Sequence, residues 1–229
     1  MGLLSKTHSA SSQPTPAPAP PPTPSQLMPP PQFPPSFVVY SISLNNHHYI
    51  LAETEHTPPL FAVSFHAGFH GMTGPDVELH SGPNESQPPL ATAKRGHLLG
   101  DNASVKLRGP DGGGLVKEVV NSTHNFPYPK YDFTIEVGKP GEPQQREQFE
   151  WQHIGMRKGW QLVRLSTSEV VALFEWTALT KKDLHFQFVG TGGTGLLGER
   201  WAIMAAITAI RAWDQVKRKQ AAGTVGIPS

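Results

Sequence analysis

The sequence predicts a mainly β protein, with about twelve strands closed into an antiparallel barrel around a C-terminal hydrophobic helix. Short β-branched and aromatic segments recur between residues 37 and 189, and Gly, Pro and Asn breakers separate them. No convincing helical pattern precedes residue 196. From Leu196 to Trp213, thirteen of the eighteen residues are then apolar.

The expected strands follow one another at the spacing of an all-β protein. They are Phe37–Ser43, His48–Glu53, Leu60–Ala67, Asp76–His80, Leu90–Lys94, Ser104–Arg108, Leu115–Asn121, Tyr131–Val137, Gln148–Ile154, Trp160–Leu165, Val170–Trp176 and Leu184–Val189. The segment Ser104–Arg108 alternates polar and apolar residues without exception, as a half-buried strand does.

The final apolar segment predicts one helix from Leu197 to about Lys219. Between Trp201 and Trp213 only Thr208 and Arg211 interrupt its apolar surface. A helix that is apolar nearly all round is buried in protein or lies in lipid. This one is too short and too charged to span a bilayer, which needs roughly 18 or more apolar residues. We therefore expect a core helix and no transmembrane segment.

A closed barrel removes exposed strand edges, but a large barrel is too wide for strand side chains to fill. The helix would fill this space with the larger side chains Trp201, Ile203, Met204, Ile207 and Ile210. The alanines between them, Ala202, Ala205, Ala206 and Ala209, would let the strands approach. A two-layer sandwich capped by the helix is the alternative, but it would leave one helical face polar.

Composition divides the chain into three parts. Residues 1–35 are a proline-rich leader whose composition predicts disorder. Residues 36–219 are the single folded domain, and residues 220–229 are expected to form a disordered tail. The leader could dock to proline-reading protein domains, although a tether is the more common role of such a segment.

Charge and cysteine content exclude several classes of function. The net charge of +1 provides no global field toward nucleic acid, so no nucleic-acid partner is expected. The absence of cysteine excludes disulfides and thiolate sites. Without a secretory signal, we expect a cytoplasmic protein that reaches membranes only at their surface.

The glycine-rich segment Gly190–Gly195 matches the G-x-G-x-x-G spacing of dinucleotide-binding loops. Such a loop opens a β-α-β unit, whereas this one follows the last expected strand. We interpret it as a flexible loop through which the chain turns from the barrel wall to its interior.

The histidines do not predict a metal site. His47 and His48 are adjacent, so a strand would point them apart, and His66 and His70 precede a glycine-rich turn. A catalytic metal typically has three protein ligands. We expect surface or loop histidines, no metal and no cofactor.

No catalytic constellation is recognisable either. The carboxylates Glu147, Glu150, Glu169 and Glu175 are expected to be ordinary solvated strand charges. The three tryptophans on successive strands, Trp151, Trp160 and Trp176, are expected to pack inside the barrel. The sequence thus predicts a protein that binds and does not catalyse.

Two stretches resemble the tubby C-terminal-like superfamily, which includes tubby proteins, phospholipid scramblases and plant LURP-one-related proteins. One stretch is Pro89–Gly100, which is similar to a barrel hairpin whose basic strand turns through a Leu-rich bend. The other is the apolar helix from Trp201 to Asp214. The resemblance implies a twelve-stranded barrel around a central helix.

The basic residues Lys94, Arg95, Lys106 and Arg108 form the candidate binding site for anionic phospholipid headgroups, including phosphoinositides. Lysine and arginine on one face can hold phosphate by charge and hydrogen bonds. In tubby proteins the phosphoinositide-binding residues lie in a similar Lys-x-Arg segment. Here Lys94 and Arg95 are adjacent, so strand alternation would point them apart.

Two other functional hypotheses remain open at this point. One is a small-molecule-binding protein or metal-dependent enzyme, with a pocket at a barrel mouth near His66 and His70. The other is a protein-interaction scaffold recruited through residues 12–35.

Overall fold

The structure of this protein is a computed structural model. It describes residues 33–42, 48–66, 74–96, 102–109, 114–123, 129–139, 141–154, 159–176 and 183–221, together with Gly2 and Gly223. Several sequence predictions lie outside these residues: most of the leader and tail, His47, His70 and the Leu-rich bend after Arg95.

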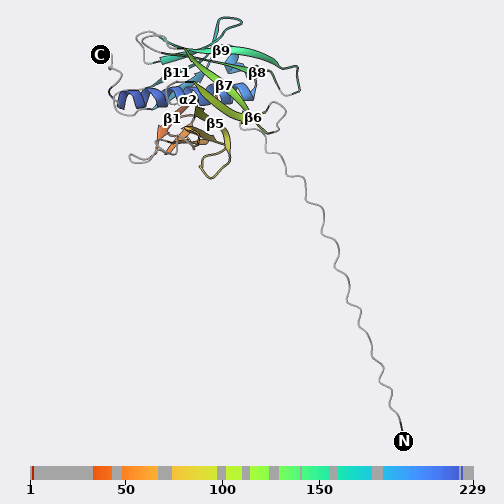
Figure 1. Cartoon of the computed structure of the whole chain (residues 1–229). Helices are drawn as coiled ribbons and strands as arrows, with labels where there is room; N and C mark the ends of the chain where they lie inside the picture. The colour runs from red at the N-terminus through yellow and green to blue at the C-terminus, as the bar shows by residue number, and fades with distance from the viewer. Residues whose placement is uncertain are drawn as a thin grey trace. The chain divides into compact units, whose positions relative to one another are not determined.

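The described residues form twelve strands that close into an antiparallel barrel, which confirms the predicted fold class (Figure 1). The strands are β1 (Ser36–Ser41), β2 (His48–Ala52), β3 (Phe61–Phe65), β4 (Val77–His80), β5 (Pro89–Arg95), β6 (Ala103–Arg108), β7 (Leu115–Thr123), β8 (Lys130–Val137), β9 (Gln145–His153), β10 (Gly159–Arg164), β11 (Glu169–Trp176) and β12 (Leu184–Phe188). Each strand pairs with its neighbours in sequence, and β1 pairs with β12 to close the ring.

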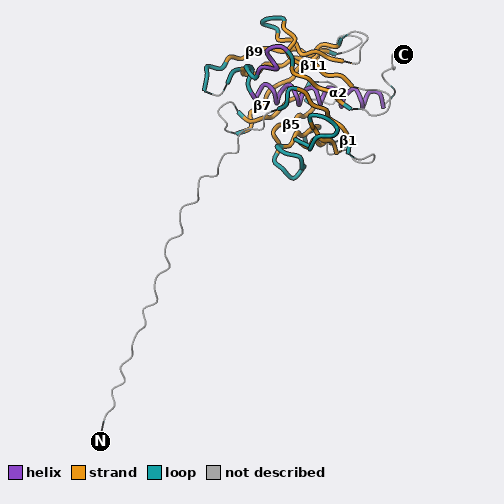
Figure 2. Tube along the Cα trace, turned by 180° about the vertical axis from the view of Figure 1, so that it is seen from behind, coloured by secondary structure: helices purple, strands orange, loops and turns teal. Residues whose placement is uncertain are grey.

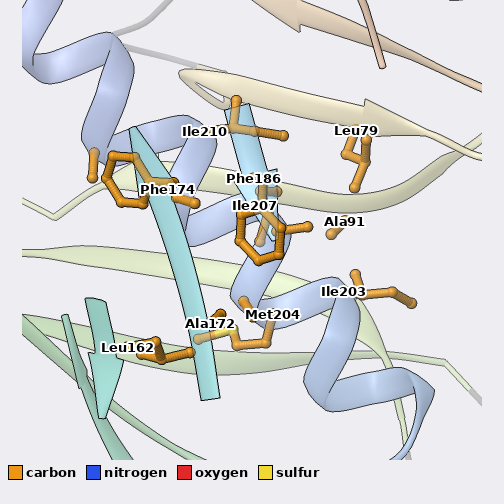
Figure 3. Packing of buried hydrophobic residues seen from close by; sticks show 14 of the residues in the cluster. Leu79, Ala91, Leu162, Ala172, Phe174, Phe186, Ile203, Met204, Ile207 and Ile210 are labelled. Atoms are coloured by element: carbon orange, nitrogen blue, oxygen red, sulfur yellow. The ribbon is translucent and has the colours of Figure 1, made fainter. Parts of the chain in front are cut away.

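The helix α2 (Glu199–Ala221) runs through the barrel, with strands on both sides of it in Figures 1 and 2. Figure 3 shows Met204, Ile207 and Ile210 of α2 among side chains from the surrounding strands. The five large side chains predicted to fill the barrel are all buried, and so are three of the four alanines, while Ala202 is half-buried. The predicted central helix is therefore confirmed.

The two polar residues that interrupt the apolar surface of α2 are also buried. The Thr208 hydroxyl donates a hydrogen bond to the Met204 carbonyl oxygen at 2.7 Å and accepts one from the Trp151 indole at 2.9 Å. Because the Thr208 hydroxyl both donates and accepts a hydrogen bond, the residue can be buried without the free-energy cost of an unpaired polar group. Trp151, Trp160 and Trp176 all lie in the core, as predicted.

The glycine-rich segment is a packed turn and not the flexible loop that was predicted. Gly190–Thr194 forms the 3-10 helix η1. The Glu169 carboxylate accepts hydrogen bonds from the backbone N–H and the hydroxyl of Thr191, at 2.7 and 2.8 Å. A Cβ atom at Gly192 would overlap the Val171 carbonyl oxygen. Close packing against β11 therefore explains this glycine.

The folded part extends slightly beyond both predicted boundaries. Phe33, which was assigned to the leader, stacks on Phe61 with ring centroids 4.9 Å apart. The Phe188 N–H donates to the Pro35 carbonyl oxygen at 2.9 Å. At the other end, α2 continues to Ala221, two residues into the predicted tail. Within the described ranges, no helix has the length and apolar character needed to cross a membrane.

Replacing Ile207, which is fully buried in α2, with Ala should lower the free energy of unfolding by about 2–5 kcal/mol, because the barrel cannot collapse onto the cavity. Urea denaturation measures this change. Ile42→Ala is the matched control, since Ile42 is 60% exposed and its truncation should change stability by no more than about 0.5 kcal/mol. Equal losses in the two variants would contradict a central role for α2.

Candidate functional site

Lys106 and Arg108 lie on the outer face of β6. The intervening Ala103, Val105 and Leu107 are buried in the core, so the alternate side chains must point outward. Both basic residues are exposed, as the alternation of this segment indicated. Because they are two positions apart on one strand, the two side chains share one face of the barrel wall.

The other two predicted site residues occupy different environments on β5. Lys94 pairs with Ser104 of β6, so its half-buried side chain belongs to the same outer face as Lys106. Arg95 follows at the end of the strand, and its backbone N–H donates to the Asp76 carboxylate at 2.5 Å. By strand alternation Arg95 belongs to the opposite face. Three of the four residues therefore share the outer face.

A further basic residue, Lys117, joins this surface from β7. Lys117 lies directly opposite Lys106 in the β6–β7 ladder, and both side chains are exposed. Like charges directly opposite each other destabilise a sheet. In the part of the chain that the structure describes, neither lysine has an ion-pair partner. Two neighbouring cations without an ion-pair partner among the described residues therefore lie on the outer wall.

Two exposed apolar residues flank Lys117 on β7. Leu115 is 57% exposed and pairs with Arg108, and Val119 is 52% exposed and pairs with Ser104. Both partners point outward, so Leu115 and Val119 project from the face that carries Lys106 and Lys117. We refer to Lys94, Lys106, Arg108, Leu115, Lys117 and Val119 as the basic face. It combines positive charge with exposed apolar side chains.

An ionic cluster around the buried Glu118 holds β7 against α2 beneath the basic face. The Glu118 carboxylate points inward and receives hydrogen bonds from Arg200 of α2 at 2.6 Å and from Arg146 of β9 at 2.9 Å. Both arginines also pair with Glu136 of β8. Arg200 in addition donates to the Arg108 carbonyl oxygen at 3.0 Å. The cluster fixes the backbone that displays the exposed residues.

Electrostatics stabilise the charged form of Glu118. Burial alone would raise the pKa of its carboxyl, but the hydrogen bonds from Arg146 and Arg200 outweigh burial, and the pKa is lowered. In the same region, burial raises the pKa of Glu199 although nearby Arg108 opposes this effect. Arg108 thus has an acidic neighbour, which makes Lys106 and Lys117 the less compensated cations.

One carboxylate that was predicted to be solvated is buried instead. Glu147 is 7% exposed and forms a bidentate pair with Arg164 of β10. The Ser166 hydroxyl donates to the same carboxylate at 2.8 Å. The hydrogen bonds from Arg164 lower the pKa of Glu147 against the effect of burial. This ion pair joins β9 to the end of β10, where Arg164 also lies opposite Glu169 of β11.

The described histidines do not form a metal site, and no group of three His, Asp or Glu side chains among the described residues could hold a metal ion. His66 lies at the edge of the barrel near Glu78, with 3.6 Å between the imidazole and the carboxylate. His80 differs from the expected surface or loop histidine because it is buried. Its ring contacts the Ser64 hydroxyl and the Gln87 carbonyl oxygen, each at 2.9 Å.

A hollow of about 680 Å³ lies on the outer wall over β1, β11 and β12, and not at the barrel mouth near His66. Its floor includes the outward-facing Val38 and Leu173, and the turn around Glu55 borders it. In the ring of strands, β12 is opposite β6, so this hollow and the basic face belong to different sides of the wall.

No protein-family model, no curated protein and no solved structure matches this chain. Functional conclusions therefore depend on the geometry described above.

Replacing Glu118 with Gln should lower the free energy of unfolding at neutral pH by about 1.5–3 kcal/mol, since two hydrogen bonds to a charged group are weakened. Because the folded-state pKa is lowered, the stabilisation by Glu118 is present above the ordinary carboxyl pKa and is lost as pH falls through the folded pKa. Chemical denaturation between neutral and acidic pH should therefore give a shallower pH dependence for Glu118→Gln than for the wild type.

The exposed Glu142, substituted in the same way, is the control and should leave the pH profile unchanged. A Glu118→Gln profile that superimposes on the wild-type profile would contradict the assigned role of the cluster.

Proposed function

We propose that this protein is a non-enzymatic barrel that attaches to membrane surfaces by binding anionic phospholipid headgroups, such as phosphoinositides, through the basic face. The observation that carries the proposal is the pair Lys106 and Lys117, two exposed lysines opposite each other without an ion-pair partner among the described residues. A headgroup phosphate would supply the missing counter-charge for both.

The apolar residues of the basic face favour a membrane over a soluble anion. Leu115 and Val119 are both more than half exposed beside the lysines. Side chains of this kind add affinity when they enter the interfacial region of a bilayer, while lysines are attracted to anionic lipids. A protein that bound only a soluble phosphate would gain nothing from keeping these two side chains in water.

The resemblance to the tubby C-terminal-like superfamily supports the same class of ligand. The site differs from the residue set expected from that resemblance, because Arg95 belongs to the other face and Lys117 replaces it.

The leader hypothesis remains a separate prediction. Residues 12–32 lie outside the described part of the chain, and a role in binding proline-reading domains would be compatible with membrane attachment.

Replacing both Lys106 and Lys117 with Ala should weaken binding to phosphoinositide-containing vesicles about 30-fold at low salt, since each lysine near an anionic surface contributes about 1 kcal/mol. Co-sedimentation with neutral and anionic vesicles, at low and physiological salt, measures the effect. Wild-type binding should require the anionic lipid and weaken as salt increases.

Lys181→Ala with Lys182→Ala is the charge-matched control, because these lysines lie between β11 and β12 in the sequence and belong to none of the three strands that form the basic face. Equal weakening by the two double variants would show a general charge effect and would overturn the site assignment.

Replacing Leu115 and Val119 with Ser should also weaken vesicle binding, and the remaining binding should depend more strongly on salt, because only the electrostatic attraction is left. Repeating the salt titration with this variant tests the point. Unchanged affinity would restrict the site to headgroup contacts and exclude insertion of these side chains.

A further inference from the structure

Three aromatic rings surround a positive charge at the barrel end where α2 finishes. The Lys217 ammonium lies 3.6 Å from the ring centroid of Trp213, 4.2 Å from that of Tyr49 and 4.6 Å from that of Phe65. A cation within about 6 Å of an aromatic face is attracted by the electrons of the ring. The Lys217 ammonium therefore occupies a three-sided aromatic cage.

The cage walls are arranged nearly at right angles. The Tyr49 ring is inclined by 87° to Phe65 and by 86° to Trp213, with centroids 4.9 and 5.6 Å apart. Phe65 and Trp213 are inclined by 67°, with centroids 5.9 Å apart. The rings thus contact one another edge to face, and the Lys217 ammonium lies over all three of them, as a cation does in the aromatic cages that recognise quaternary ammonium groups.

The rings are held by the barrel and not by Lys217. Trp213 is fully buried on α2, Phe65 is buried on β3, and Tyr49 packs against the core from β2. Lys217, by contrast, is half-buried near the end of α2 and carries its ammonium on a flexible four-carbon chain. The cage can therefore keep its shape when the lysine leaves.

The surroundings of the cage favour a positive ligand. Asp214 and Asp183 are both buried near Tyr49. Burial raises the pKa of the Tyr49 phenol, and the two carboxylates raise it further, so the phenol stays neutral while the local potential is negative. Arg218 offsets part of this potential through its ion pair with Asp214 at 2.6 Å.

We propose that the cage formed by Tyr49, Phe65 and Trp213 is a binding site for a quaternary ammonium group, and that the Lys217 ammonium occupies it when the ligand is absent. A trimethylammonium group carries its charge on methyl groups and has no N–H to satisfy, so aromatic faces suit it. The group could belong to a soluble compound such as choline or to the headgroup of phosphatidylcholine. The proposal uses none of the residues of the basic face.

Proton NMR of choline titrated with the full-length protein tests the proposal, because ring currents shift methyl protons enclosed by aromatic faces upfield. We expect a saturable upfield shift with the wild type and about tenfold tighter binding with Lys217→Ala, which removes the internal competitor. The double variant Lys217→Ala, Tyr49→Leu should lose this increase in choline affinity. The Lys106→Ala, Lys117→Ala protein should behave as the wild type does, which separates this site from the basic face.

The neutral isostere 3,3-dimethylbutan-1-ol provides a control that needs no substitution. It has the shape of choline without the charge and should give no saturable shift. No shift of choline with the wild type, or equal binding of choline and the isostere, would overturn the proposal.

Vesicles of phosphatidylcholine distinguish the two sources of the ligand. If the Lys217→Ala protein binds these vesicles and the added Tyr49→Leu substitution abolishes that binding, the ligand is the lipid headgroup. If the protein binds choline but not the vesicles, the ligand is a soluble ammonium compound. Both results support the cage.

Discussion

The interior of a twelve-stranded barrel is too wide for strand side chains alone to fill, and the rest of this structure depends on how the space is occupied. Helix α2 occupies it with side chains such as Met204 and Ile207, while alanines on the same helix let the wall approach. Because strands on several sides of the ring pack against one helix, the buried side chains of the wall belong to a single core. In strands such as β6, alternate residues are then available to solvent or to a ligand.

Several polar groups that enter this core are paired, and these pairs connect the helix to particular strands. Thr208 joins α2 to β9 through Trp151, and Tyr131 of β8 donates to Gln215 at 2.7 Å. At the start of α2, Arg200 reaches Glu118 on β7. The last contact bears on the proposed membrane attachment, because it holds the inner side of the strand whose outer side carries Lys117 and two exposed apolar residues.

The barrel could be predicted from the sequence, because polar–apolar alternation along a strand and a nearly all-apolar helix are both local patterns. It was not sufficient to identify Lys117, because only the register of β7 against β6 places that residue opposite Lys106. Glu147 looked solvated for a similar reason, as its partner Arg164 lies on another strand. The aromatic cage combines residues from β2, β3 and α2, which no spacing in the sequence brings together. Local sequence patterns therefore do not show which residues from distant segments lie next to each other in the fold.

The central claim, that the basic face contacts a membrane, can be tested most directly by labelling single positions. The chain has no cysteine, so Val119→Cys on β7 and Gln187→Cys on β12 each introduce one site for an environment-sensitive fluorophore. The two positions lie on opposite sides of the ring of strands. With phosphoinositide-containing vesicles, the account predicts a blue-shifted emission at position 119 and none at position 187. A shift at position 187 alone, or at neither position, would contradict it.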